Sequence, residues 1–331
     1  MGALFSIPML SFLLVPAMSS YGTSLNLLFF YITWTTLVLS HSPLKVEIVG
    51  TIAVRLLFYL IPSLIFFLFD VLVPSAAVIL KAHGSHGLPS GKKRKSGKKE
   101  AKVAACAVFN LLLGLLVQAS IEVCLTKGLK MKSAIKVSTR LPLPWEILTD
   151  LLRGLFGREL LEYIIHRYIL HSSTLRVAKN HDTWYHALHT PYPLTAHYDH
   201  PIPYLLLRFL PMFLPAAIFR FHLLSFILYL SLISLEETFA YSGYKAMPTS
   251  FFIGGIAKRV EMHLTNSGNG NYSPWGIMDW IFGSSIGDSV ADDSLEDTEE
   301  FDVDELAEKL MERSRKRRRG LKRQSRKRTD S

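Results

Sequence analysis

Long apolar runs alternate with shorter polar segments along most of the chain. The clearest runs cover residues 24–40, 51–80, 103–125, 204–219 and 223–241, and a helix needs ~20 residues to cross the hydrocarbon core of a bilayer. The run over 145–165 carries six charged residues, so we expect a helix that ends at the membrane surface. The pattern predicts an all-α integral membrane helical bundle.

Charge divides the chain further. Lysines and one arginine fall among Gly and Ser in residues 81–102, and an acidic block followed by an arginine-rich block fills residues 288–331. Both segments are predicted to be disordered because like charges repel and stay solvated. DNA binding or nuclear localisation is the competing reading. Between apolar runs, however, a cytoplasmic loop and attraction to anionic lipid fit better, so no nucleic-acid partner is expected.

These shifts in composition predict four regions. They are an N-terminal hydrophobic region over 1–80, the basic loop over 81–102, a membrane domain over 103–287, and the charged tail over 288–331. Most of the excess positive charge behind the net charge of +10 sits in two basic blocks, one in the loop and the arginine-rich one in the tail. Cys106 and Cys124 fall inside one apolar run, where we expect small buried side chains rather than a disulfide or a cysteine metal site.

The polar stretch from His166 to Pro201 holds seven of the twelve histidines of the chain. Imidazole is the most common protein ligand for transition metals. A loop that is rich in histidine by chance is the alternative, but packing gives no reason for such a density. A metal site is the better hypothesis, and the topology places it on the cytosolic side as a cap on the bundle.

The spacing of these histidines limits how they can converge. His166 and His171 are five residues apart, which places them about 140° apart on an ideal α-helix. They can share a metal only if the helix unwinds there, or if two metals are bound. His181 and His186 repeat the step of five, and three further histidines follow: His189, His197 and His200.

The donor types narrow the choice of metal. Neutral imidazoles favour iron or zinc over magnesium or calcium, which prefer oxygen ligands. Glu162 lies one helical turn before His166 and could orient its ring, although a salt bridge with Arg158 or Arg167 is as good a reading. Without an HExxH motif or spaced cysteines, a zinc protease or zinc finger is disfavoured.

Taken together, these motifs resemble the fatty acid hydroxylase and sterol desaturase superfamily over about 151–285. The first histidine pair matches the family's first box, and the His181–His186 segment matches the second. The strings Ala196-His-Tyr-Asp-His200-Pro201 and Asn271-Tyr-Ser-Pro-Trp-Gly-Ile-Met-Asp279 resemble later landmarks. The resemblance implies a membrane enzyme with two iron ions, and a ligand set of His166, His171, His181, His186, His189, His200 and His263.

The chain departs from the family pattern at several ligand positions. Tyr185 stands where the family has the first of two adjacent histidines, and Tyr241 stands where it often has another. We expect these two tyrosines, like Glu162, in the surroundings of the ligands. His197, Glu236 and Glu237 are possible additional ligands, because buried carboxylates in a span are costly and often functional. Acids at a helix end are the ordinary alternative.

The resemblance implies an oxygen-dependent enzyme that hydroxylates or desaturates a lipid or sterol in the endoplasmic reticulum membrane. No flavin or nicotinamide fingerprint is present, so electrons would come from cytochrome b5 and its reductase. The first alternative is a relative that has lost catalysis and acts as a lipid-binding or scaffold protein. The second is a zinc hydrolase using the same cage. His41 in a loop and His222 at a hairpin tip are expected to be neutral to substitution.

Overall fold

The computed structural model describes residues 20–81, 88–89, 98–188, 191–244, 255–266 and 268–287, and these are helical with no strand among them. The charged tail over 288–331 and His189 lie outside the described residues. The helices are α2 (Ser20–Ser40), α3 (Pro43–Arg55), α4 (Ile61–Leu72), α5 (Pro74–Leu80), α6 (Lys98–Val123), α7 (Pro144–Ile164), α8 (Arg176–Trp184), α9 (Pro201–Tyr204), α10 (Leu210–Ile218), α11 (Leu223–Ala240), α12 (Gly255–Thr265) and α13 (Ile277–Ile281).

Several helices continue into short turns of π or 3₁₀ type. π-helical turns occur at Leu56–Leu60, Cys124–Gly128, Ile165–Leu170 and Leu205–Phe209, and a 3₁₀ turn occurs at Pro193–His197. Proline begins α3, α5, α7 and α9, where the missing N–H costs nothing. The turn at Leu56–Leu60 makes α3 and α4 one continuous helical segment, and α5 follows after Val73.

Four helices of the described chain are long and apolar enough to cross a membrane. They are Pro43–Leu72, Glu100–Gly128, Pro201–Ile218 and Leu223–Ala240, and a shorter apolar helix covers Leu25–Ser40. The predicted segment 145–165 does form a helix, α7, but its charged residues keep it out of this group. The architecture is therefore an all-helical membrane bundle, as the hydrophobic pattern predicts.

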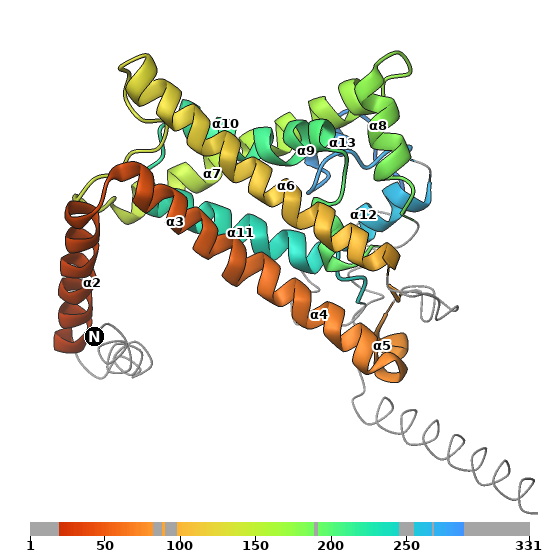
Figure 1. Ribbon diagram of the computed structural model, residues 1–331, viewed down its shortest axis with the longest axis horizontal. Helices are drawn as coiled ribbons and strands as arrows, with labels where there is room; N and C mark the ends of the chain where they lie inside the picture. The colour runs from red at the N-terminus through yellow and green to blue at the C-terminus, as the bar shows by residue number, and fades with distance from the viewer. Residues whose placement is uncertain are drawn as a thin grey trace, which may run out of the picture.

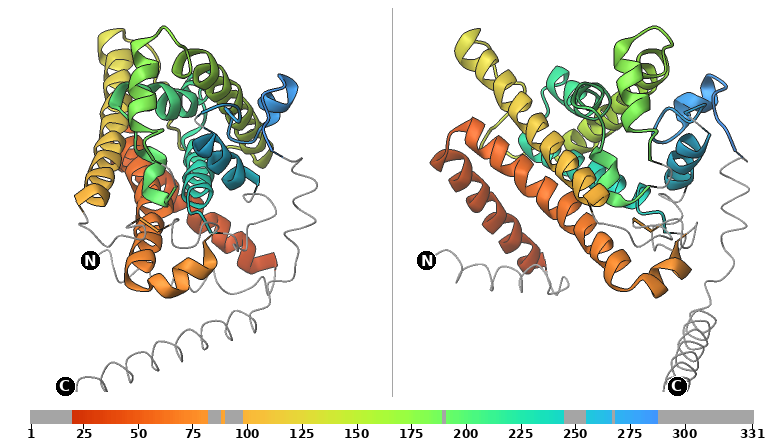
Figure 2. Two further views of the ribbon diagram at one scale, coloured as in Figure 1. Left: turned by 90° about the vertical axis from the view of Figure 1, so that its right-hand side faces the viewer. Right: turned by 45° about the vertical axis from the view of Figure 1, so that its right-hand side comes forward.

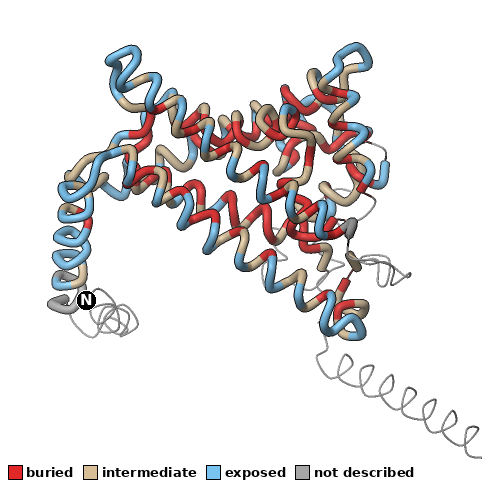
Figure 3. Tube along the Cα trace, viewed as in Figure 1, coloured by how far each residue is buried: buried red, intermediate tan, exposed pale blue. Residues whose placement is uncertain are grey.

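Helix α11 is the centre of the bundle. It packs against α3 on one side and α7 on the other, and α10 lies along α7 (Figure 1). The core around α11 is formed by side chains that are at most 1% exposed: Phe221, Leu223, Phe226, Tyr229, Leu230 and Ile233. The outer faces of α2, α3 and α4 are exposed (Figure 3), as expected for apolar surfaces that contact lipid.

Two sequence predictions need correction here. The basic loop does not extend over all of 81–102: Lys81 is 2% exposed and pairs with Asp70 at 2.6 Å, and α6 already begins at Lys98. Both cysteines are free as expected, but Cys124 is exposed and Cys106 only partly buried. An apolar residue in a membrane helix faces lipid as readily as the core, so hydrophobicity alone does not predict burial in the protein.

The polar segments gather at one end of the bundle. Helix α8 packs on the π-turn that follows α7, α12 packs on the end of α11, and α13 packs on α7. In Figure 2, α8, α12 and α13 lie together at the end of the molecule away from α2. This end contains the histidine-rich segment.

Candidate metal centre

A π-turn resolves the spacing of the first histidine pair. Residues Ile165–Leu170 close i→i+5 hydrogen bonds, and the His171 N–H donates to the His166 carbonyl at 3.0 Å. A π-turn places residues five apart one above the other, unlike an α-helix, and such turns occur often at functional sites. The two rings consequently lie with centroids 4.9 Å apart. This is the local unwinding that a shared centre requires.

Five imidazoles from three segments meet at this point. His181 comes from α8, His186 from the turn after it, and His263 from α12. Neighbouring rings in the group have centroids 4.5–5.5 Å apart. One ligand nitrogen each from His166, His171, His181 and His263 can be chosen so that all four lie within 4.8 Å of one another. We call His166, His171, His181, His186 and His263 the histidine cluster.

Three rings of the histidine cluster are oriented through Nδ1. That atom contacts the Tyr272 carbonyl from His166 at 2.8 Å, the Asp199 carboxylate from His181 at 2.6 Å, and the Gly270 carbonyl from His263 at 2.7 Å. Each acceptor requires a proton on Nδ1, which leaves Nε2 as a lone-pair donor. This is the arrangement that fixes histidines bound to metals.

The Nε2 atoms fit a transition metal. In the described part of the chain all five Nε2 atoms are buried without a hydrogen-bond partner, and so is Nδ1 of His186. Burial lowers the pKa of His171 to about 4 and also lowers the pKa of His181, His186 and His263, so these rings are neutral at physiological pH. Buried polar atoms without partners are costly, and a metal ion would satisfy them together.

A C-terminal loop closes over the histidine cluster. Gly268 has φ +78°, and a Cβ there would come within 2.3 Å of the His171 ring, so a side chain cannot be accommodated. Asp279 organises the rest of this loop by accepting hydrogen bonds from Tyr272 N–H at 2.9 Å and Ser273 N–H at 2.8 Å. Glu159 of α7 accepts from Trp275 and Ile277 N–H groups, both at 2.9 Å.

His200 and His197 do not join the histidine cluster. His200 caps α9, where its Nδ1 accepts from Ile202 N–H at 3.3 Å, and its ring packs on Trp184. His197 has both nitrogens engaged, Nε2 with Glu237 at 3.0 Å and Nδ1 with the Tyr204 hydroxyl at 3.2 Å. The 3₁₀ turn and α9 carry these rings away from the other five.

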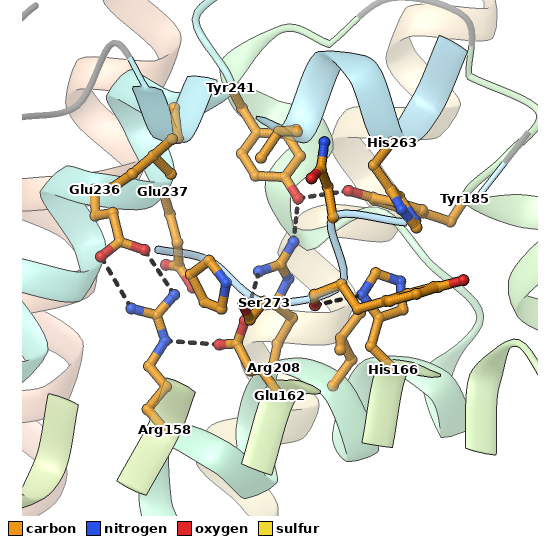
Figure 4. Close-up of a pocket in the computed structure, with 17 residues that line it drawn as sticks. Arg158, Glu162, His166, Tyr185, Arg208, Glu236, Glu237, Tyr241, His263 and Ser273 are labelled. Carbon is orange, nitrogen blue, oxygen red and sulfur yellow. Dashed lines mark hydrogen bonds and ion pairs between the residues drawn. The ribbon is translucent and has the colours of Figure 1, made fainter. Parts of the chain in front are cut away.

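The acidic residues predicted near the metal are bound to arginines instead. Glu162 accepts from Arg158 at 2.6 Å in a salt bridge that is buried rather than at the surface, and the ring of His166 is oriented by Tyr272. Glu236 pairs with Arg158 at 2.7 Å. Glu237 pairs with Arg55 at 2.5 Å. Three glutamates predicted as possible ligands or orienting groups thus form ion pairs within the bundle (Figure 4).

The two tyrosines at expected histidine positions contact each other. The hydroxyls of Tyr185 and Tyr241 are 2.5 Å apart, and Arg208 of the π-turn before α10 donates to Tyr241. The ring of Tyr185 stacks on His181, with centroids 5.0 Å apart. Tyr185 therefore lies against the histidine cluster, and Tyr241 lies behind it. Arg208 was not predicted; a lone cation inside an apolar run was its signal in the sequence.

Comparison with known proteins agrees with the arrangement of the site. Residues 151–284 match the model of the family described as fatty acid hydroxylase. This match and the relative described next support the resemblance to the fatty acid hydroxylase and sterol desaturase superfamily. The fatty acid hydroxylase segment contains the complete histidine cluster, from His166 to His263.

A curated relative supports the same assignment. The chain is 33% identical over 162 residues to a protein named Methylsterol monooxygenase 2-2 from Arabidopsis thaliana. That alignment covers 46% of this chain and 59% of the relative, so the chain spans less than two thirds of the relative's length. No solved structure matches the chain.

Proposed function

We propose that the chain is a membrane oxygenase that hydroxylates or desaturates a lipid or sterol with molecular oxygen. The observation that carries the proposal is the set of five buried, unpartnered Nε2 atoms among the described residues, inside a segment matched as fatty acid hydroxylase. The relative named a methylsterol monooxygenase makes a sterol a reasonable substrate class.

Iron is the proposed metal, and zinc is the alternative metal for the same imidazole ligands. The histidine cluster would hold the metal, with Asp199 and the carbonyls of Tyr272 and Gly270 fixing three of the rings. Bound there, iron would supply the oxidising chemistry that an unactivated C–H bond needs. Gly268 allows the loop to pack directly on His171 and His186 and so keeps bulk water from the rings.

The electrons would come from a partner protein. The glycine-rich stretch at Gly268–Gly270 packs on the histidine cluster, and the sequence carries no flavin or nicotinamide fingerprint. Cytochrome b5 and its reductase on the cytosolic face of the endoplasmic reticulum are the proposed donors. The family resemblance implies two iron ions.

The function is tested on cells that lack the protein and are complemented with variants. His186→Ala should abolish formation of the oxidised lipid, because the His186 ring lies 5.0–5.1 Å from the rings of His171, His181 and His263. Membrane insertion should be unchanged, and exposed His41→Ala is the matched control. Lipid profiles by mass spectrometry give the readout. Full activity in the His186 variant would remove this residue from the ligand set.

A second function has one specific observation in its favour. Tyr185, Tyr241 and Arg208 form a hydrogen-bonded group where the family resemblance places histidines. A relative that keeps the fold, binds lipid and lacks catalysis would tolerate such changes. A purified protein that is folded and free of metal would support this function and reject the oxygenase.

A further inference from the structure

One cavity joins the histidine cluster to the buried charges beside it. His166, Tyr185, Arg208, Tyr241 and His263 all line this cavity, and in Figure 4 the Tyr185 ring lies beside His263 while its hydroxyl points toward Tyr241. The ring of Tyr185 also lies 5.4 Å from that of His186, centroid to centroid. Among the described residues, the groups available to bind a second metal ion next to the cluster are those that face this space.

The tyrosine side of the cavity already contains a cation. Arg208 donates to the Tyr241 hydroxyl, whose oxygen lies 2.5 Å from the hydroxyl oxygen of Tyr185. Tyrosine ligates metals as a phenolate, and its phenol normally keeps its proton to a pH near 10. A divalent ion placed here would also be repelled by the Arg208 guanidinium at low effective dielectric. The tyrosine pair therefore offers no replacement for the missing imidazoles.

The carboxylates around the cavity are all engaged in ion pairs with arginines. Glu162, Glu236 and Glu237 are ion-paired with Arg158 and Arg55, and Arg208 lies 3.8 Å from Glu162. Three arginines and three glutamates of the described bundle thus balance in charge. Taking any one carboxylate for a metal would leave a guanidinium buried without a counterion, which is strongly unfavourable. The His197 imidazole is held between Glu237 and Tyr204 and does not face the metal either.

We propose that this chain binds one metal ion rather than a pair. The histidine cluster holds that ion, and Arg208 with Tyr185 and Tyr241 takes the place of the second. The proposal rests on the proposed function only in treating the histidine cluster as a metal site. It predicts a centre that differs in stoichiometry from the one that the family resemblance implies.

Metal counting on the full-length protein in detergent tests the proposal. The protein is loaded anaerobically with Fe²⁺ or Co²⁺, passed over a desalting column and analysed by mass spectrometry of the metal. We expect about one ion per chain, a loss of most of it in His181→Ala, and about one ion in His41→Ala. Two ions per chain in the wild type overturn the proposal, as does a protein that retains none.

Rebuilding the second position tests the role of Arg208. Tyr185→His with Tyr241→His adds two imidazoles but keeps the cation, so this double variant should still bind about one Co²⁺. Adding Arg208→Gln should raise the count toward two. In both variants the first ion reports that the cluster is intact. A double variant that binds two ions, or a triple variant with an intact cluster that stays at one, contradicts the assignment of Arg208.

The result separates this inference from the proposed function. A single ion without any lipid oxidation leaves the stoichiometry standing and rejects the oxygenase. Two ions with lipid oxidation do the reverse. Electron paramagnetic resonance of the Co²⁺ protein adds an independent readout, because an isolated ion gives its full spin intensity whereas two coupled ions give much less.

Discussion

Asp199 accepts a hydrogen bond from Nδ1–H of His181, a member of the histidine cluster. Its carboxylate lies 2.6 Å from His181 Nδ1, and its other oxygen accepts from His200 N–H at 2.6 Å. Asp199→Asn keeps the shape but removes the charge that favours the Nδ1–H tautomer. We expect metal affinity to fall by about 10–100-fold. Titration of the apoprotein with Co²⁺ measures this.

Asp182 provides the matched control for that variant. It lies next to His181 in sequence but is exposed to solvent. Asp182→Asn also removes one carboxylate charge, from α8 beside His181, without touching Nδ1, so its affinity for Co²⁺ should stay within about a factor of two of the wild type. Equal losses in the two variants would show that the carboxylate of Asp199 has no orienting role.

His222 has a structural role at the start of α11, while its predicted neutrality for lipid oxidation stays a prediction. It is 6% exposed, and its Nδ1 accepts from Leu224 N–H at 3.1 Å, which caps the first turn of α11. Loss of such a cap costs about 1 kcal/mol. His222→Ala should therefore lower the unfolding temperature in detergent while leaving the metal count unchanged, and His222→Asn should restore most of the loss.

At this scale, the sequence predicted the members of the histidine cluster better than the groups around them. The five members of the histidine cluster were all predicted, because core packing and solvation give a chain no cause to repeat imidazoles at a regular spacing. His200 was predicted too, but its proximity to the others depends on how the chain turns after His197. Arg208 and Asp199 could not be assigned, because the partner of a buried charge is set by helix packing and not by local sequence.

Among the elements, α7 has two faces that hydropathy averages together. Leu148, Leu152, Phe156, Leu160 and Ile164 repeat every four residues and are 36–58% exposed. The opposite face carries buried Arg158 and Glu162, which pair within the bundle. The predicted helix over 145–165 is correct, but mean hydropathy understates the contact of its apolar face with lipid.

Close contact between α7 and α11 depends on Gly154. A Cβ at this position would lie 2.8 Å from the Tyr229 ring, and the Tyr229 hydroxyl donates to the Gly154 carbonyl at 3.1 Å. Gly154→Ala should destabilise the protein by about 1–3 kcal/mol by overpacking this contact. Thermal unfolding in detergent measures the change.

Gly128 is the comparison for Gly154. It also lies in a helical segment, but a Cβ there would lie 4.0 Å from the nearest atom, the sulfur of Cys124. Gly128→Ala should leave the unfolding temperature unchanged or raise it slightly, because alanine is the better helix former. Similar losses at both glycines would mean that α7 and α11 are not packed as closely as described.

For the whole molecule, the metal should connect segments that are distant in sequence. The histidine cluster joins the end of α7, α8 and α12, so binding free energy adds to the stability of the assembled end of the bundle. Removal of metal by a chelator should lower the unfolding temperature, and Co²⁺ or Fe²⁺ should restore it. A free ligand concentration of 100 times Kd corresponds to about 2.7 kcal/mol.

His263→Ala tests whether this stabilisation comes from the cluster. Its Nδ1 normally contacts the Gly270 carbonyl, and the variant removes one ligand nitrogen together with that contact. Its unfolding temperature should be low both with and without added metal. A response as large as that of the wild type would place the stabilising ion at another site.

The six-residue ion-pair group also has a consequence for how the protein is made. Arg55 lies in α3 and Arg158 in α7, whereas their partners Glu236 and Glu237 lie in α11, which is synthesised last of the three. An isolated α11 entering lipid would carry two carboxylates with no counterion. Insertion of α11 should thus require that α3 and α7 are already in the membrane. A truncated chain that lacks α3 should stall at the translocon and be degraded.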